Sequence, residues 1–281
     1  MTKKLLGKEV NEAAIADLSG RAAKLAEAGI APTLAIYRIG EKPDDLAYER
    51  GAMKRAEKVG VAVKQVVLPE DVSQEEAMAA MAALNEDPQV HGILLFRPLP
   101  KHLDEEALCN AMAPDKDVDG ITEISQARIY AGRSDGFAPC TAEACMKILQ
   151  HYGIDPSGKE VAVIGRSQVI GKPVAMLLIK ANATVTVCHT RTRDLAKVCK
   201  DKDILIAAAG HPGTVTADCL APGQTVIDVA INFDENGNMC GDVAAGAAED
   251  VVDAITPVPG GVGAVTTTVL MEHVIRAAEN R

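Results

Sequence analysis

Aromatic residues are scarce in this 281-residue chain, which has no tryptophan, three phenylalanines and four tyrosines. Its hydrophobic cores must therefore be built from aliphatic residues and methionine. No apolar stretch reaches the roughly 18 residues that a membrane span requires, and the residues after Met1 form no signal-peptide core. The net charge of −10 disfavours nucleic acid or an anionic membrane as a partner. We therefore expect a cytoplasmic protein with no membrane or nucleic-acid partner.

The cysteines and histidines lack the spacings of familiar metal sites. The seven cysteines are odd in number and include no C-x-x-C pair, and the six histidines form no H-E-x-x-H cluster. This pattern favours reduced thiols over a disulfide framework or a zinc site. We therefore expect no catalytic metal.

Strand and helix patterns alternate along the chain. In the first half the sequence predicts strands at 33–38, 61–67 and 92–96, and helices at 43–59 and 75–84. In the second half it predicts strands at 160–165, 184–188, 203–208 and 225–231. Such alternation with short connections is typical of parallel sheets covered by helices on both faces. We predict an α/β protein of two domains, the second a Rossmann-type doubly wound parallel sheet of four or five strands.

Residues 159–173, KEVAVIGRSQVIGKP, have the pattern of a strand, a glycine turn and a helix. Glycines such as Gly165 and Gly171 let a backbone approach a ligand, and a helix N-terminus offers unpaired N–H groups to phosphate. The turn lacks the full G-x-G-x-x-G spacing, so a glycine turn without a ligand remains an alternative at this point.

The following strand lacks the acidic residue that NAD-specific domains commonly carry at its end. Strand 184–188 is followed by HTRTR, with no carboxylate. Arg166, Arg191 and Arg193 offer positive charge for a 2′-phosphate, although three surface arginines without a ligand would give the same pattern. The arginines favour NADP.

Six stretches, in this order, resemble the methylenetetrahydrofolate dehydrogenase/cyclohydrolase family. They are Tyr48 within 43–59, PLP at 98–100, PDKDVDG at 114–120, the turn at 165–173, DVAIN at 228–232 and PVPGGVG at 257–263. The resemblance implies a folate-binding catalytic domain of residues 1–138 plus 267–281, an NADP-binding Rossmann domain of residues 139–266, and a cleft between them. It also implies tetrahydrofolate derivatives as substrates and a homodimer.

The resemblance implies the site residues as well. The carboxylate of Asp119 would accept hydrogen bonds from the pterin ring, and the ring of Tyr48 would pack on the folate, so both are expected in catalysis. Further substrate-binding residues implied are Phe96, Pro98, Leu99, Pro259, Gly260, Gly261 and Gly263. The cofactor-binding residues implied are Gly165, Arg166, Ser167, Gly171, Thr190, Arg191 and Ile231. From the residues alone, Tyr48 as a core residue and Asp119 as a loop cap remain alternatives.

Two positions depart from the bifunctional pattern of the family. Ala52 stands where a catalytic Lys follows Tyr48 by four residues, and Phe96 stands where that Lys has a Gln partner. Lys54 falls on another helix face, and Arg97 is expected to point away from Phe96. We therefore expect NADP-dependent oxidation of 5,10-methylenetetrahydrofolate to 5,10-methenyltetrahydrofolate, with weak or absent cyclohydrolase activity.

Three alternatives remain. The protein could be fully bifunctional, with a different residue performing hydrolysis. It could be a non-catalytic folate- or nucleotide-binding subunit, against which the intact cofactor residues argue. A shikimate-type dehydrogenase has the same two-domain plan, but it would need a Lys/Asp pair in the first half, where we find none.

Overall fold

The computed structural model describes residues 1–280 and divides the chain into two compact units. The first unit comprises Met1–Glu12 and Thr141–Thr266, and the second comprises Ala13–Cys140 and the residues from Thr267 onward. The expected boundaries grouped residues 1–12 with the folate-binding domain. They group differently here because strand β1 (Lys3–Lys4) pairs in parallel with β11 (Ala254–Ile255) of the first unit.

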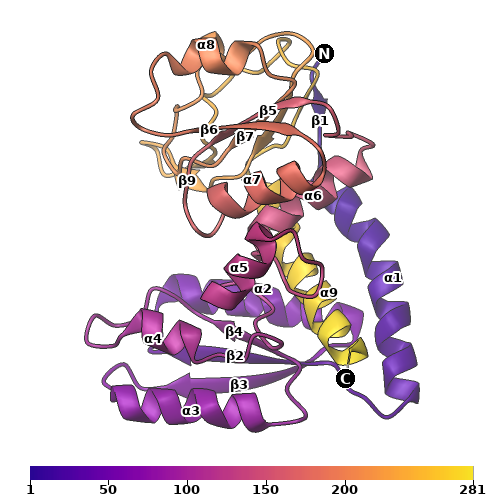
Figure 1. The fold of residues 1–281 in the computed structure, drawn as a ribbon, viewed down its shortest axis with the longest axis vertical. Coiled ribbons are helices and arrows are strands. Elements are labelled where there is room, and N and C mark those ends of the chain that lie inside the picture. The colour runs from indigo at the N-terminus through magenta and orange to yellow at the C-terminus, as the bar shows by residue number, and fades with distance from the viewer. Residues whose placement is uncertain (281) are drawn as a thin grey trace. The chain divides into compact units, whose positions relative to one another are not determined.

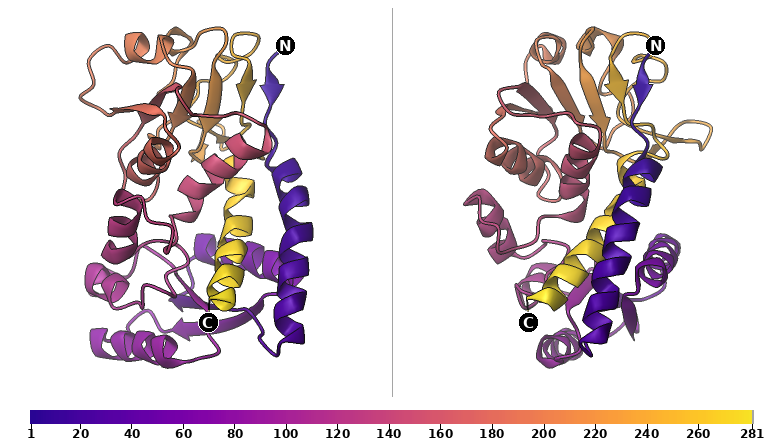
Figure 2. Two further views of the ribbon diagram at one scale, coloured as in Figure 1. Left: turned by 45° about the vertical axis from the view of Figure 1, so that its right-hand side comes forward. Right: turned by 90° about the vertical axis from the view of Figure 1, so that its right-hand side faces the viewer.

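The first unit contains a six-stranded sheet in the order β1-β11-β8-β7-β5-β6, with every neighbouring pair parallel. Its longer strands are β5 (Glu160–Ile164), β6 (Thr184–Cys188), β7 (Ile204–Ala207) and β8 (Thr225–Asp228). Helices α7 (Gly171–Lys180) and α8 (Leu195–Lys200) lie on opposite faces of this sheet (Figure 1). The predicted Rossmann-type architecture is confirmed, with two short strands, β11 and then β1, added beside β8 (Figure 2).

The remaining elements of the first unit are short or lie outside the large sheet. They are α6 (Cys140–His151), the antiparallel pair β9 (Asn232–Phe233) and β10 (Met239–Cys240), and two 3₁₀ turns, η1 (Ala217–Cys219) and η2 (Val262–Ala264).

The second unit contains a three-stranded parallel sheet in the order β3-β2-β4. Its strands are β2 (Thr33–Ile39), β3 (Ala62–Leu68) and β4 (Gly92–Leu95). Its helices are α2 (Pro43–Val59), α3 (Gln74–Glu86), α4 (Glu105–Asn110) and α5 (Glu123–Tyr130), together with most of α1 (Gly7–Glu27) and α9 (Thr266–Glu279). Helix α3 packs on the sheet face that carries Ala35, Tyr37 and Ile39, while α2 lies on the opposite side (Figure 1).

Local sequence accounts for the helices that position the site. Helix α2 begins at Pro43 and buries one stripe, Glu49, Ala52, Ala56 and Val59. Helix α3 begins after Ser73, which forms a capping box with Glu76. Among residues 1–280, no helix combines the length and apolar character needed to cross a membrane.

Candidate functional site

The glycine turn after β5 lies where the order of the sheet reverses. The chain passes from β5 outward to β6 and then returns to β7 on the other side of β5, so this edge is a topological switch point. Gly165 has φ +130°, and a Cβ there would lie 2.0 Å from the carbonyl oxygen of Ala208 after β7. Only glycine therefore fits between the ends of β5 and β7. Because glycine has no side chain, a nucleotide could approach the backbone closely there.

The start of α7 differs from the expectation of unpaired N–H groups. The hydroxyl of Ser167 accepts the N–H groups of Ile170 and Gly171 at 3.1 and 3.4 Å, and its carbonyl accepts the N–H of Lys172 at 3.0 Å. Pro173 has no N–H to offer. Ser167 therefore shapes the turn by capping the helix, and fewer helix N–H groups are available to phosphate than the sequence suggested.

The turn after β6 carries the expected phosphate-binding side chains. The N–H of Gly165 donates to the carbonyl of Cys188 at 2.9 Å, which joins the glycine turn to the end of β6. Arg166, Thr190 and Arg191 are all exposed at these two adjoining turns. Because no carboxylate lies between Cys188 and Arg193, the side chains at these two turns carry a net positive charge.

A cavity of about 300 Å³ in the first unit brings together other predicted site residues. It is lined by Asp228–Ile231, Met239 and Pro257–Ala264. It therefore joins Ile231, predicted for the cofactor, to Pro259, Gly260, Gly261 and Gly263, predicted for folate. Thr256 fixes one wall, because its hydroxyl accepts the N–H of Asp228 at 2.7 Å and donates to the carbonyl of Asp228 at 3.1 Å.

In the second unit, Tyr48 and Phe96 form an edge-to-face aromatic pair with ring centroids 5.8 Å apart. Tyr48 is 38% exposed, whereas Phe96 is 8% exposed. Ala52 is fully buried one helical turn beyond Tyr48, and Lys54 is exposed on another face of α2. The positions at which the resemblance implies a Lys and a Gln thus carry a methyl group and a phenyl ring.

The segment after Phe96 is held from two sides. The N–H of Leu99 donates to the Glu105 carboxylate at 2.8 Å, and the Lys42 ammonium donates to the carbonyl of Pro98 at 2.5 Å. Arg97 lies beside Glu105, with 3.9 Å between guanidinium and carboxylate, while Phe96 faces Tyr48.

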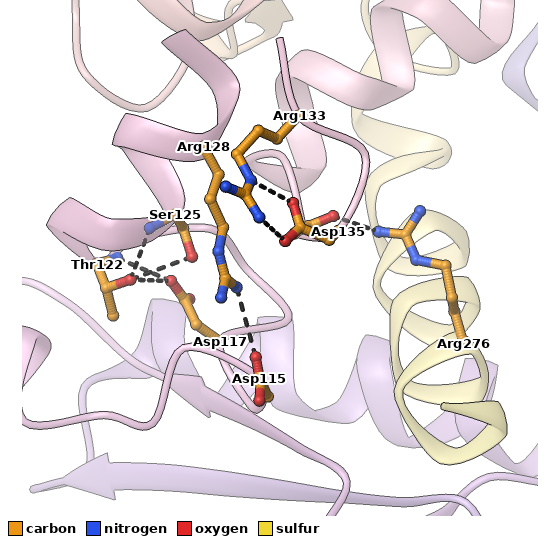
Figure 3. A network of polar contacts seen from close by, with 9 residues as sticks. Asp115, Asp117, Thr122, Ser125, Arg128, Arg133, Asp135 and Arg276 are labelled. Atoms are coloured by element: carbon orange, nitrogen blue, oxygen red, sulfur yellow. Dashed lines mark hydrogen bonds and ion pairs between the residues drawn. The ribbon is translucent and has the colours of Figure 1, made fainter. Parts of the chain in front are cut away.

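The three aspartates of the 114–120 loop have different surroundings. Asp117 is completely buried and accepts the N–H groups of Ile121 and Thr122 and the Thr122 hydroxyl at 2.7–3.0 Å (Figure 3). Asp115 is 88% exposed and pairs with Arg128 at 3.4 Å. Asp119 is half-buried, with a pKa raised by burial. Asp117 is thus committed to the backbone that follows the loop, and Asp115 faces solvent beside α5, which leaves Asp119 as the candidate for a ligand.

Comparison with known proteins decides the family. The family model "Tetrahydrofolate dehydrogenase/cyclohydrolase, catalytic domain" matches residues 5–119, and the model of its "NAD(P)-binding domain" matches residues 139–281. The chain belongs to the tetrahydrofolate dehydrogenase/cyclohydrolase family. The resemblance noted in the sequence is confirmed over both halves of the chain.

Relatives within this family match nearly the whole length. The bifunctional protein FolD of Clostridioides difficile is 47% identical over 273 residues, which are 97% of this chain and 95% of that protein. The crystal structure of the bifunctional FolD enzyme of Campylobacter jejuni matches with a TM-score of 0.97 and 36% identity, over all of both chains.

A further family structure bears on the cofactor. The Trypanosoma brucei FolD enzyme, complexed with NADP cofactor and an inhibitor, matches with a TM-score of 0.92 and 33% identity over 99% of this chain and 98% of that one. Together with the NAD(P)-binding family model, this supports NADP as the cofactor.

Sequence reasoning missed three polar residues near Asp119. Burial raises the pKa of the Asp119 carboxyl, and Cys140, Arg97 and His273 each lower it. Arg97 could have been suspected from its place beside Phe96. No sequence motif pointed to Cys140 or His273, because Cys140 lies 21 residues beyond Asp119 and His273 belongs to an amphipathic helix. Among residues 1–280, no three His, Cys, Asp or Glu side chains gather into a metal-binding group.

Proposed function

We propose that this protein is an NADP-dependent 5,10-methylenetetrahydrofolate dehydrogenase whose cyclohydrolase activity is weak or absent. When bound, NADP supplies the acceptor for a hydride from the one-carbon bridge of the folate. The remaining task of the protein is to align donor and acceptor carbons and to exclude water.

For the folate we assign the residues that the sequence predicted. Asp119 accepts hydrogen bonds from the pterin ring, and Tyr48 packs against the folate, its ring set edge-on by Phe96. Pro98 and Leu99 follow in the same segment of the second unit. Pro259, Gly260, Gly261 and Gly263 contribute from the first unit, beside the 300 Å³ cavity.

For the cofactor we assign Gly165 and Gly171 to close backbone approach, and Arg166, Thr190 and Arg191 to the 2′-phosphate. Ser167 maintains the turn, and Ile231 lies at the cavity. The cationic turns after β5 and β6, with no competing carboxylate, support NADP over NAD.

The replacement of a polar pair by Ala52 and Phe96 carries the proposal on cyclohydrolase. Hydrolysis of the methenyl bridge requires delivery of water and movement of protons, and positioned acid–base groups commonly contribute about 10²–10⁴-fold in rate. A methyl group and a phenyl ring can do neither. Hydride transfer makes no such demand, so the two activities separate.

Full bifunctionality is the second candidate, because the relatives named above are bifunctional enzymes. In that case Arg97 or Lys54 would have to perform the acid–base step. Arg97 lies beside Glu105, and Lys54 lies on the exposed face of α2, so neither position favours this role. A non-catalytic subunit would leave the glycine turn and arginines without a purpose. The family resemblance also favours a homodimer, which analytical ultracentrifugation would test.

The test supplies methenyltetrahydrofolate without a nicotinamide cofactor and follows its absorbance against buffer alone. We expect hydrolysis at the buffer rate, together with robust NADP reduction when methylenetetrahydrofolate is supplied. The double variant Ala52→Lys/Phe96→Gln should gain hydrolysis. Hydrolysis well above buffer that is abolished by Arg97→Ala or Lys54→Ala would instead establish the bifunctional alternative.

A further inference from the structure

The backbone on both sides of Asp119 is fixed by close packing. A Cβ on Gly92 of β4 would lie 2.6 Å from the Val118 side chain, so Val118 presses directly on that strand. Gly120 has φ +65°, and a Cβ there would lie 2.6 Å from the backbone nitrogen of Pro139. The segment from Val118 to Gly120 therefore has little freedom to move.

Two buried polar side chains converge on the carbonyl that precedes Asp119. His273 of α9 is fully buried, with Nδ1 2.8 Å from the carbonyl oxygen of Val118. Since a carbonyl only accepts, Nδ1 carries the hydrogen and donates it. The Cys140 thiol, at the start of α6, lies 3.4 Å from the same oxygen and 3.9 Å from His273 Nδ1.

The same two residues also act on the Asp119 carboxyl itself. Both lower the pKa of that carboxyl and so favour its ionised form. The other charged groups that face it are Arg97, which favours ionisation, and Asp117, which opposes it. Burial raises the pKa of Asp119, so these contacts offset the tendency of the carboxyl to become neutral.

Packing alone does not explain this choice of residues. Burying an imidazole away from water is unfavourable unless its polar atoms are bonded. The ring lies 5.0 Å from the ring of Phe137, whose phenyl group offers its nitrogens no hydrogen-bond acceptor in the plane of the ring. A carboxylate that must accept hydrogen bonds from a ligand, however, needs both a fixed direction and its negative charge.

We propose that Cys140 and His273 are positioning residues that orient the Asp119 carboxylate for the pterin ring. The proposal rests on the proposed function, because it assumes that Asp119 binds folate. It adds two residues to that site, neither of which takes part in hydride transfer.

The test measures kcat/KM for methylenetetrahydrofolate against pH in Cys140→Ala, Cys140→Ser and the unmodified protein. Loss of the thiol should raise the KM for folate severalfold, up to about tenfold, because the Val118 carbonyl next to Asp119 loses one of its two hydrogen-bond donors. It should also move the acid side of the pH profile to higher pH, because the ionised carboxyl loses support. The KM for NADP should not change. Cys140→Ser keeps a donor and should restore both values toward normal.

A matched control lies on the same helix. Cys145 is also fully buried, but its thiol donates to the Thr141 carbonyl within α6 at 3.3 Å. Cys145→Ala creates a comparable cavity, so it should lower the free energy of unfolding without moving the pH profile. An equal shift of the pH profile in both variants would overturn the proposal.

His273 is tested by a conservative pair. The amide nitrogen of Asn can occupy the position of Nδ1, so His273→Asn should keep the KM for folate near normal, whereas His273→Leu should raise it. Calorimetric binding of tetrahydrofolate gives a readout without turnover. If the unmodified protein does not bind tetrahydrofolate, the proposed function fails. If it binds and turns over folate normally but Cys140→Ala and His273→Leu match it across the pH range, only the positioning role fails.

Discussion

Asp115, Asp117 and Asp119 alternate along one loop, yet only Asp117 is enclosed by backbone donors. We expect Asp119→Ala to lower kcat/KM for methylenetetrahydrofolate about tenfold to a hundredfold, because one hydrogen bond to a charged group is lost. Its free energy of unfolding should change little. Steady-state kinetics and urea denaturation measure both quantities.

Asp117→Ala is the matched comparison from the same loop. It leaves buried N–H groups of Ile121 and Thr122 without an acceptor, so it should destabilise the fold by about 1–3 kcal/mol or more. If Asp119→Ala retained normal folate kinetics, Asp119 would be only a loop residue.

Arg166 and Arg191 determine the choice of cofactor in this account. The double change Arg166→Ala/Arg191→Ala should raise the KM for NADP at least tenfold while changing the KM for NAD little, because NAD has no 2′-phosphate. Arg50→Ala, which removes an exposed arginine from α2, serves as the control. Equal use of NADP and NAD by the unmodified protein would contradict the assignment.

Asp228 links stability to pH. Burial raises its pKa to about 6, although the N–H groups of Asp242 and Val243 bond its carboxylate at 2.9 and 3.0 Å. The carboxyl is harder to ionise in the folded chain than in the unfolded chain. Its stabilising contribution is therefore complete below about pH 4 and is lost as the pH rises toward 6.

We expect that loss to reach about 3 kcal/mol, from two pKa units. Urea denaturation of the unmodified protein and Asp228→Asn between pH 4 and 7 tests this, since the variant lacks the titration. The difference in free energy of unfolding between the two proteins should shrink as the pH rises. A difference that is constant with pH would show that the carboxyl titrates normally.

At the scale of elements, α2 is fixed to the sheet by a buried ion pair. Arg38 Nε of β2 donates to the Glu49 carboxylate at 2.9 Å, and the two side chains are 6% and 4% exposed. Gln65 of β3 donates to the same carboxylate. This pair fixes the rotation of α2, and therefore directs Tyr48 outward and Ala52 inward.

Glu49→Gln should lower the free energy of unfolding by about 3–5 kcal/mol, because the Arg38 guanidinium stays buried without a countercharge. The exposed Glu57→Gln on the same helix should change it by less than about 0.5 kcal/mol. Similar denaturation midpoints for both variants would mean that the buried pair contributes nothing.

Elements with strong local signals could be predicted from the sequence. Helix α2 and strand β6 have the predicted bounds, 43–59 and 184–188, because proline, glycine and valine patterns mark them. Strand β1 could not be predicted, since Lys3 and Lys4 show no apolar alternation and their partners lie about 250 residues away. Strand β8 is shorter than predicted and ends at Asp228, where the side chain bonds a later segment.

The candidate site, too, could be predicted only where a local motif marks it. Motifs with a fixed spacing, such as the 114–120 loop and the glycine turn, point directly to Asp119 and Gly165. The different partners of the aspartates depend on contacts with residues that follow the loop, Ile121 and Thr122 for Asp117 and Arg128 of α5 for Asp115. The approach of His273 depends on a helix more than 150 residues away. Such contacts are set by tertiary packing, which one sequence does not reveal.

At the scale of the whole molecule, family membership is established by two domain models that cover 5–119 and 139–281. The central claim concerns which of the family's two activities this chain retains. In the proposed function, Ala52 and Phe96 of the second unit bear on hydrolysis, whereas the residues assigned to the nucleotide belong to turns of the first unit. A protein that keeps one activity and lacks the other should therefore release methenyltetrahydrofolate as its end product.

The most direct measurement is the ratio of methenyltetrahydrofolate to NADPH, followed continuously by absorbance as the protein oxidises methylenetetrahydrofolate. We expect a ratio near one, which falls only at the rate of spontaneous hydrolysis in buffer and does so independently of protein concentration. A ratio well below one that decreases further as protein is added would contradict this expectation, because the protein would then be hydrolysing its own product.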